Sequence, residues 1–188
     1  MGKYVPAIVT GLIVTVVLAV LLSAVGMTGF SLWYIPVFLG LLTGYLMANL
    51  QGTKAGPKAS DAEKAAVLAL HPSPGKALII AYRQGFVGKA AGMNITLDGA
   101  PLAQIKSPQF TAKEVDPGQH GLGFTFAGLA AAQNKPVVVG AQVSEGEVVA
   151  YRASLSMGAL KNTINVERID DLTGLADGLR KMKMVAAS

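Results

Sequence analysis

The chain has 188 residues, of which 52% are hydrophobic and 14% are charged, with a formal net charge of +5 and no cysteine. Soluble domains carry about 25% charged residues, so this composition favours a membrane anchor joined to a small domain. The absence of cysteine excludes disulfides, thiolate nucleophiles and cysteine-based metal sites. The positive charge does not indicate a nucleic-acid partner, because aromatic and basic residues are not interleaved along the sequence.

Two apolar stretches near the start of the sequence predict membrane-spanning helices. They are Val5–Val25 and Phe30–Leu50, each 21 residues long, and a bilayer core requires about 20. No Lys, Arg, Asp or Glu occurs between Tyr4 and Thr53. We therefore predict a two-helix transmembrane hairpin over residues 1–52. A cleaved signal peptide is the alternative interpretation of the first stretch, and we expect that stretch to be retained as a span.

The charges that flank the hairpin predict its orientation. Lys3 precedes it, and Lys54, Lys58 and Lys64 follow it, whereas the intervening turn has no basic residue. Because basic residues stay on the cytoplasmic side, we expect a bacterial inner-membrane protein whose soluble domain lies in the cytoplasm. Neither span contains an ionisable Asp, Glu, His, Lys or Arg, which argues against an ion pathway or a proton relay.

Small residues recur at every fourth position on both predicted helices. This small-residue stripe consists of Gly11, Thr15, Ala19, Gly40, Gly44 and Ala48. Small side chains let helix backbones approach closely in lipid. Two interpretations remain open: the two helices pack on each other through the stripe, or one side of the stripe docks a helix of a partner protein.

A linker with a short helix is expected over residues 53–75, where Ser60 and Glu63 form a capping-box pattern. Beyond it the hydrophobic period changes to two, which is typical of β-strands. Strands separated by Asp-Gly, Pro-Gly and similar turns predict an all-β antiparallel sandwich over residues 76–169. The expected strands are 77–83, 93–97, 102–106, 110–115, 121–126, 136–143, 148–156 and 163–169. The tail, residues 170–188, has leucines at helical spacing and predicts a C-terminal amphipathic helix.

Several motifs of this region carry a family resemblance. The segment from "KALIIAYRQGF" to "DPGQHGLGF", with the later "VSEGEVVAYRASLSMG" and "NVERID", resembles the bacterial DUF2846 family. The "DG…PG.H" core is also similar to PEGA domains. The resemblance covers about Lys76 to Asp171, and it implies a small β-sandwich with no catalytic residue. Many such domains lie outside the cytoplasm, some as lipoproteins, whereas this chain has a helical hairpin.

Two Tyr-Arg pairs are the candidate ligand contacts. Tyr82 and Arg83 occur in one expected strand, and Tyr151 and Arg152 occur in another. Their symmetry predicts that the pairs meet at one end of a sheet and contact an anion or another ligand, with pairing to Asp or Glu as the alternative. His120 follows a Pro-Gly turn and is expected to be a structural residue. No catalytic residue, cofactor site or metal site is predicted.

Two functional hypotheses follow from these patterns. The first is a non-catalytic accessory or scaffold subunit of a larger membrane complex, for example a photosynthetic or respiratory assembly. Its partners would be other integral membrane subunits and the lipid bilayer. The second is a membrane-tethered binding module whose sandwich recognises a peptide, a lipid headgroup or a sugar. An enzyme is not expected, because no catalytic motif occurs.

Overall fold

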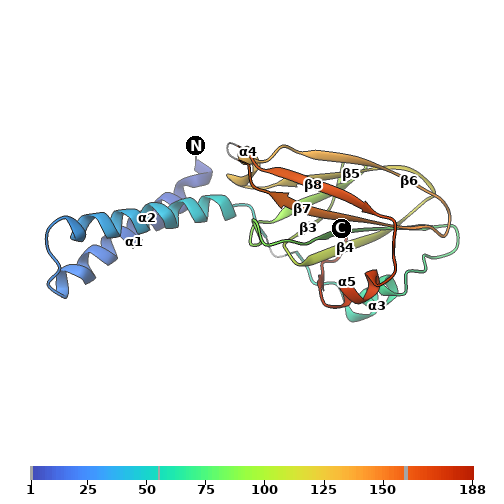
Figure 1. Ribbon diagram of the computed structural model, residues 1–188, viewed down its shortest axis with the longest axis horizontal. Helices are drawn as coiled ribbons and strands as arrows, with labels where there is room; N and C mark the ends of the chain where they lie inside the picture. Colours follow the sequence, from blue (N-terminus) through green and yellow to red (C-terminus); the bar gives the residue numbers. More distant parts are fainter. Residues whose placement is uncertain (1, 55, 159–160) are drawn as a thin grey trace. The chain divides into compact units, whose positions relative to one another are not determined.

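The computed structural model describes residues 2–54, 56–158 and 161–188. The chain divides into two compact units, Met1–Gln51 and Gly52–Ser188. Figure 1 shows a helical first unit and a second unit that contains the β-strands.

The first unit is a helical hairpin. A short 3₁₀ turn, Gly2–Tyr4, leads into α1, Val5–Ala24, and α2 follows at Phe30–Leu50. These bounds agree with the two predicted apolar stretches, and both helices are long and apolar enough to cross a membrane. Gly26 and Gly29 in the connection have φ angles of 79° and 74°. Glycine adopts this left-handed conformation without strain, so the chain can reverse direction within a short turn.

Two sheets form the second unit. The five-stranded sheet has the order β8-β7-β1-β4-β9, and the four-stranded sheet has the order β3-β2-β5-β6. The strands are β1 Ala77–Arg83, β2 Met93–Leu97, β3 Ala100–Ile105, β4 Gln109–Val115, β5 Gly118–Phe126, β6 Val137–Val143, β7 Val148–Ser156, β8 Thr163–Ile169 and β9 Lys183–Met184. All eight predicted strands are present, and their ends differ by at most three residues from the predicted ends.

The prediction of an entirely antiparallel sandwich is wrong at two strand pairs. β1 runs parallel to β7, and β4 runs parallel to β9. A parallel pair needs a long crossover connection. Here the chain builds the four-stranded sheet and β4 before β7 returns to the edge of β1. Alternation and turn motifs are local signals, and they do not encode a pairing between strands this far apart in the sequence.

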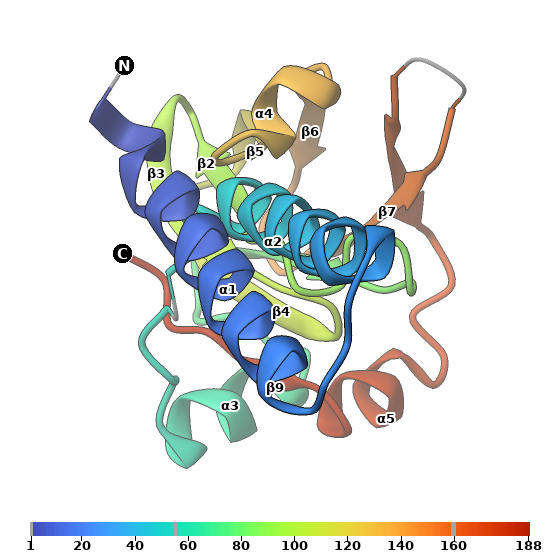
Figure 2. The ribbon, with the colours of Figure 1, turned by 90° about the vertical axis from the view of Figure 1, so that its left-hand side faces the viewer.

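The main hydrophobic core lies between the two sheets, where Ile79, Leu122 and Phe124 are fully buried. A second cluster around Ile80 and Phe110 lies on the outer face of the five-stranded sheet. Two helices cover that face, α3 at Asp61–Leu68 and α5 at Leu175–Arg180. They lie on the same side of the sheets in Figures 1 and 2. A further short helix, α4, spans Ala130–Gln133 between β5 and β6.

The predicted C-terminal helix is wrong in its extent. Only the six residues of α5 are helical, and β9 then pairs with the open edge of β4. The backbone N–H of Val185 donates to the Phe110 carbonyl oxygen at 2.8 Å, and the N–H of Ser188 donates to the Leu102 carbonyl oxygen at 2.8 Å. Gly178 lowers the helix propensity of this tail, whereas pairing with β4 supplies hydrogen bonds for its backbone.

The predicted linker packs within the second unit. Ala59 is 3% exposed, and its N–H donates to the Met184 carbonyl oxygen at 3.2 Å. The capping box is present: the Glu63 N–H donates to the Ser60 hydroxyl oxygen at 3.1 Å, and the Ser60 N–H donates to the Glu63 carboxylate at 2.6 Å. The segment before α3 and the last residues of the chain therefore hold each other against the sheet.

Candidate functional site

The small-residue stripe lies at the contact between α1 and α2. Gly11 and Gly40 are buried. A Cβ atom added to Gly11 would stand 2.7 Å from the Gly40 carbonyl oxygen, and one added to Gly40 would stand 2.6 Å from the Gly11 carbonyl oxygen. The Thr15 hydroxyl donates to the Gly11 carbonyl oxygen at 3.0 Å. These residues pack the two helices on each other, which is the first of the two interpretations of the stripe.

The remaining residues of the stripe line shallow depressions of the hairpin. Gly44 and Ala48 line a groove of about 320 Å³ between the helices, and Ala19 lines another depression beside Trp33. A Cβ atom added to Gly44 would stand 3.3 Å from the Ala7 carbonyl oxygen. Small residues therefore set how closely the helices approach.

Large apolar side chains cover the outside of the hairpin. Val16 is 61% exposed and Leu41 is 70% exposed. The rings of Phe30, Tyr34 and Phe38 stack in a row along α2, with centroid separations of 5.4 Å and 6.3 Å. Such a surface is costly in water, at roughly 25 cal/mol for each Å² of apolar area left exposed.

The two Tyr-Arg pairs lie on neighbouring strands, but their arginines lie on opposite faces of the sheet. Tyr82 is opposite Arg152 in the register of β1 and β7, whereas Arg83 is opposite Ala153. Because successive side chains alternate between faces, Arg83 points into the main core and Arg152 points to the outer face. The structure therefore does not bring the two arginines together as one ligand contact.

Arg83 is a buried structural cation. It is 1% exposed, and its guanidinium donates to the carbonyl oxygens of Ala91 at 2.5 Å and Gly88 at 2.7 Å. Its Cζ atom also lies 4.9 Å from the centre of the Phe126 ring. Burial lowers the pKa of Arg83 to about 10, so the side chain stays charged at neutral pH. Its donors point to the connection between β1 and β2, which it holds in place.

Arg152 and Tyr151 have partners within the fold, and Tyr82 is buried. Arg152 forms an ion pair with Glu167 at 2.5 Å, and this hydrogen bond raises its pKa. The Tyr151 hydroxyl donates to the Gly140 carbonyl oxygen at 3.2 Å. Tyr82 is 7% exposed, and burial raises its pKa. Pairing of Arg152 with a carboxylate matches the alternative interpretation of this motif.

His120 joins two turns at one end of the sandwich. Its Nδ1 donates to the Asp98 carboxylate at 2.7 Å, and its Nε2 donates to the Asp116 carbonyl oxygen at 2.8 Å. Both partners accept, so the ring fits this position with both nitrogens protonated. The bond to Asp98 raises the pKa of His120, and the bond from His120 lowers the pKa of Asp98. This geometry agrees with a structural role; the pattern "DPGQH" predicted the turn but not Asp98 as the partner.

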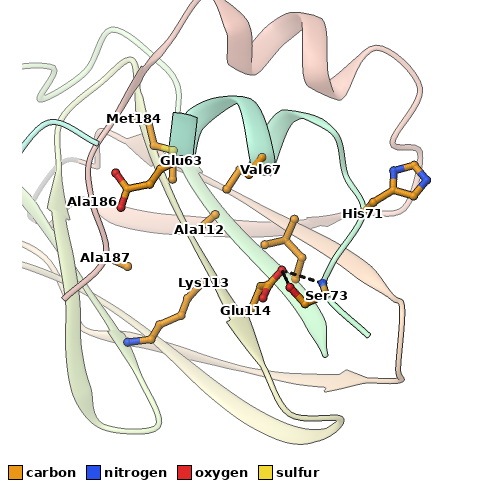
Figure 3. A pocket seen from close by; sticks show the side chains of 12 residues that line it. Glu63, Val67, His71, Ser73, Ala112, Lys113, Glu114, Met184, Ala186 and Ala187 are labelled. Atoms are coloured by element: carbon orange, nitrogen blue, oxygen red, sulfur yellow. Dashed lines mark hydrogen bonds between the residues drawn. The ribbon is translucent and has the colours of Figure 1, made fainter. Parts of the chain in front are cut away.

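A pocket of about 520 Å³ opens beside α3 (Figure 3). Val67 of α3, Leu78 of β1 and Ala112 of β4 contribute apolar lining. The sequence did not predict this pocket, because it depends on the packing of α3 and of the last residues, among them Ala186, against the edge of β4.

Polar side chains of this pocket are hydrogen-bonded within the fold. Glu114 accepts hydrogen bonds from the Ser73 N–H at 2.9 Å and from the Ser73 hydroxyl at 3.1 Å. Glu63 belongs to the capping box of α3. His71 lies at the rim, apart from the other labelled side chains (Figure 3), and its Nδ1 donates to the Ala69 carbonyl oxygen at 2.6 Å. These groups do not converge on one point, as the side chains of an acid–base pair do.

Among residues 2–54, 56–158 and 161–188, no group of three or more His, Cys, Asp or Glu side chains could hold a metal ion. No model of a known protein family matches the chain, and no curated protein matches it either. The resemblance to DUF2846 and PEGA domains therefore depends on the quoted motifs alone.

Proposed function

We propose that this protein is a non-catalytic accessory or scaffold subunit of a larger membrane complex. In this proposal the hairpin anchors it in a bacterial inner membrane, and the sandwich supports its partners on the cytoplasmic side. Photosynthetic and respiratory assemblies are the kind of host that the proposal includes. Its partners are other integral membrane subunits and the surrounding lipid.

The exposed apolar surface of α1 and α2 carries the proposal. The core helix of a soluble protein is mostly buried, whereas only 11% of the most apolar 18-residue stretch of each of these helices is buried. A bilayer or the helices of partner subunits would cover this surface at no cost in hydration. Since Gly11 and Gly40 are used between α1 and α2, the outer aromatic row at Phe30, Tyr34 and Phe38 is the surface we assign to a partner.

Gentle solubilisation followed by native electrophoresis tests this proposal. We expect the chain to migrate within an assembly much larger than its own 19.4 kDa. A photo-crosslinking residue at Tyr34 should attach to another integral membrane protein. The same residue at Val16, on the outer surface of α1, is the matched control and should attach mainly to lipid. Migration as a free monomer, with lipid adducts alone at both positions, would refute the scaffold role.

A membrane-tethered binding module is the second candidate, and the pocket beside α3 supports it. Its volume of about 520 Å³ falls within the roughly 300–1,000 Å³ of small-molecule sites. Native mass spectrometry of the purified full chain would then show a bound small molecule. Ala66→Trp, an exposed position of α3 at the pocket, should remove that mass. An unchanged protein mass in both samples would count against this candidate.

A further inference from the structure

One end of the sandwich receives the chain from the hairpin, and we call it the entry end. It consists of the β1–β2, β3–β4, β5–β6 and β7–β8 connections, which share one end because β1 is parallel to β7 and the other connected strands pair antiparallel. The Gly52 carbonyl oxygen accepts from the Gln104 Nε2 at 3.0 Å, and the Thr53 hydroxyl accepts from the Gly92 N–H at 2.9 Å. Both donors lie beside this end.

The connection between α2 and the entry end is short. α2 ends at Leu50, and the two residues from there to Gly52 span at most about 7 Å. The Debye length at physiological salt is about 8 Å. If α2 crosses a bilayer, Gly52 therefore lies within about one Debye length of the end of that helix.

The entry end exposes large apolar side chains. In the described part of Gly52–Ser188, three large hydrophobic residues are strongly exposed: Phe86 at 88%, Met157 at 77% and Val138 at 73%. Phe86 lies in the β1–β2 connection, Met157 directly follows β7, and Val138 is the second residue of β6. The Arg83 guanidinium donates hydrogen bonds to carbonyl oxygens of the β1–β2 connection. Phe86 therefore projects from a loop whose backbone is anchored to the core.

The same end is positively charged. Its four connections contain no Asp or Glu, and each contributes one lysine: Lys89, Lys106, Lys135 and Lys161. Among the described residues, none of these lysines has an ion-pair partner, whereas at the opposite end Lys76 pairs with Asp116 and Arg168 pairs with Glu147.

We propose that the entry end rests on anionic lipid headgroups of the bilayer that the hairpin crosses. The inference depends on the proposed membrane anchorage. Lysines near an anionic leaflet are attracted to it, each by a factor of about five in binding, and Phe86 and Met157 would enter the interface between headgroups and acyl chains. Four lysines without carboxylate partners match an anionic surface, and their isolation from acidic residues leaves that charge uncompensated within the fold.

The cysteine-free chain permits a direct test with single-cysteine variants of the full-length protein. Phe86→Cys and Met157→Cys are labelled with a polarity-sensitive fluorophore and reconstituted into phosphatidylcholine vesicles with or without phosphatidylglycerol. Ser144→Cys, at an exposed position of the opposite end, is the matched control. We expect blue-shifted emission and quenching by spin-labelled lipid at 86 and 157, but not at 144. The shift should require phosphatidylglycerol and weaken as salt increases.

A variant in which the four entry-end lysines are replaced by glutamine should lose this lipid-dependent shift while its circular dichroism stays unchanged. Equal emission at 86, 157 and 144, or emission that does not depend on phosphatidylglycerol, would overturn the inference. Flotation of the vesicles after an alkaline carbonate wash measures anchorage separately. Protein that floats without the shift overturns only this inference, and protein that fails to float overturns the anchorage together with it.

Discussion

The hairpin exposes its large apolar side chains, whereas the sandwich buries most of them. In the hairpin, Gly11 and Gly40 form the contact between the helices, and Val16 and Leu41 face outward. In the sandwich, large side chains such as Phe124 are fully buried. Water drives the second arrangement, because each Å² of buried apolar area stabilises the fold by roughly 25 cal/mol. In the hairpin, close contact between the helix backbones takes the place of apolar burial, as in helices that associate in lipid.

The largest expected effect concerns Arg83, the charged side chain that is buried in the described part of the sandwich core. Arg83→Met removes the donors for the Gly88 and Ala91 carbonyl oxygens, so we expect the free energy of unfolding to fall by about 3 kcal/mol. Arg152→Met is the control, because its pair with Glu167 is half-exposed and contributes less than about 1 kcal/mol. Chemical denaturation of the full chain in detergent measures both. Equal losses would show that burial does not distinguish the two arginines.

Replacement of an exposed valine by arginine should have different effects in the hairpin and in the sandwich. Val16→Arg should disfavour membrane insertion by about 2.5–3.5 kcal/mol. Val138→Arg changes a valine of the sandwich that is also strongly exposed, and should alter stability by less than about 0.5 kcal/mol. The fraction of chain recovered in the carbonate-resistant membrane pellet measures the first, and thermal unfolding measures the second. Full insertion of Val16→Arg would contradict the assignment of α1 to lipid.

The glycine contact of the hairpin should not tolerate a larger residue. Gly40→Val places methyl groups against the Gly11 carbonyl oxygen and the Thr15 hydroxyl, so we expect a loss of about 2 kcal/mol in helix–helix association. Steric trapping in micelles measures it. Leu41→Val introduces the same residue at the next position, which faces outward, and should leave association unchanged. Similar values for both variants would place the helix contact elsewhere.

The smallest effect is a pH dependence at the His120 bridge. The pKa of His120 is raised from its ordinary value of 6.5, so its stabilisation is fully present below 6.5 and is lost as pH rises through the folded-state pKa. The pKa of Asp98 is lowered, so its contribution is lost as pH falls through that lower value. His120→Gln should cost about 1 kcal/mol at mildly acidic pH and less at alkaline pH, where the neutral ring keeps one N–H donor. Denaturation midpoints across pH check this, and a pH-independent cost would exclude the charged bridge.

Local signals predicted much of the fold. Ala77–Arg83 and Val148–Ser156 were both predicted as strands with correct ends, and Ser60 with Glu63 gave the start of α3. The parallel pairing of these two strands was not predictable, because it joins segments far apart in the chain. β9 was not predicted for a related reason. The leucines before it have helical spacing, and its strand hydrogen bonds form only with β4, which lies far away in the sequence.

The candidate site was less predictable than the fold, although one signal was available. Ile79, Ala81 and Arg83 lie at alternate positions of β1 and share the face of the main core, so their spacing indicated burial of Arg83, whereas we predicted a ligand contact there. The pocket beside α3 and the charge pattern of the entry end had no local signal. Both arise from residues that meet only when separate turns come to one end or one edge of the sheets.

The pairing of the last residues has a consequence for biosynthesis. Met184, Val185 and Ser188 bond to residues that are made much earlier, near Ala59, Leu102 and Phe110. The edge of β4 and the segment before α3 therefore stay unpaired until residues 183–188 have been synthesised, at a time when both hairpin helices have already left the ribosome. Nascent chains halted before residue 183 would present an open strand edge, and a chaperone or protease at the membrane would meet that edge first.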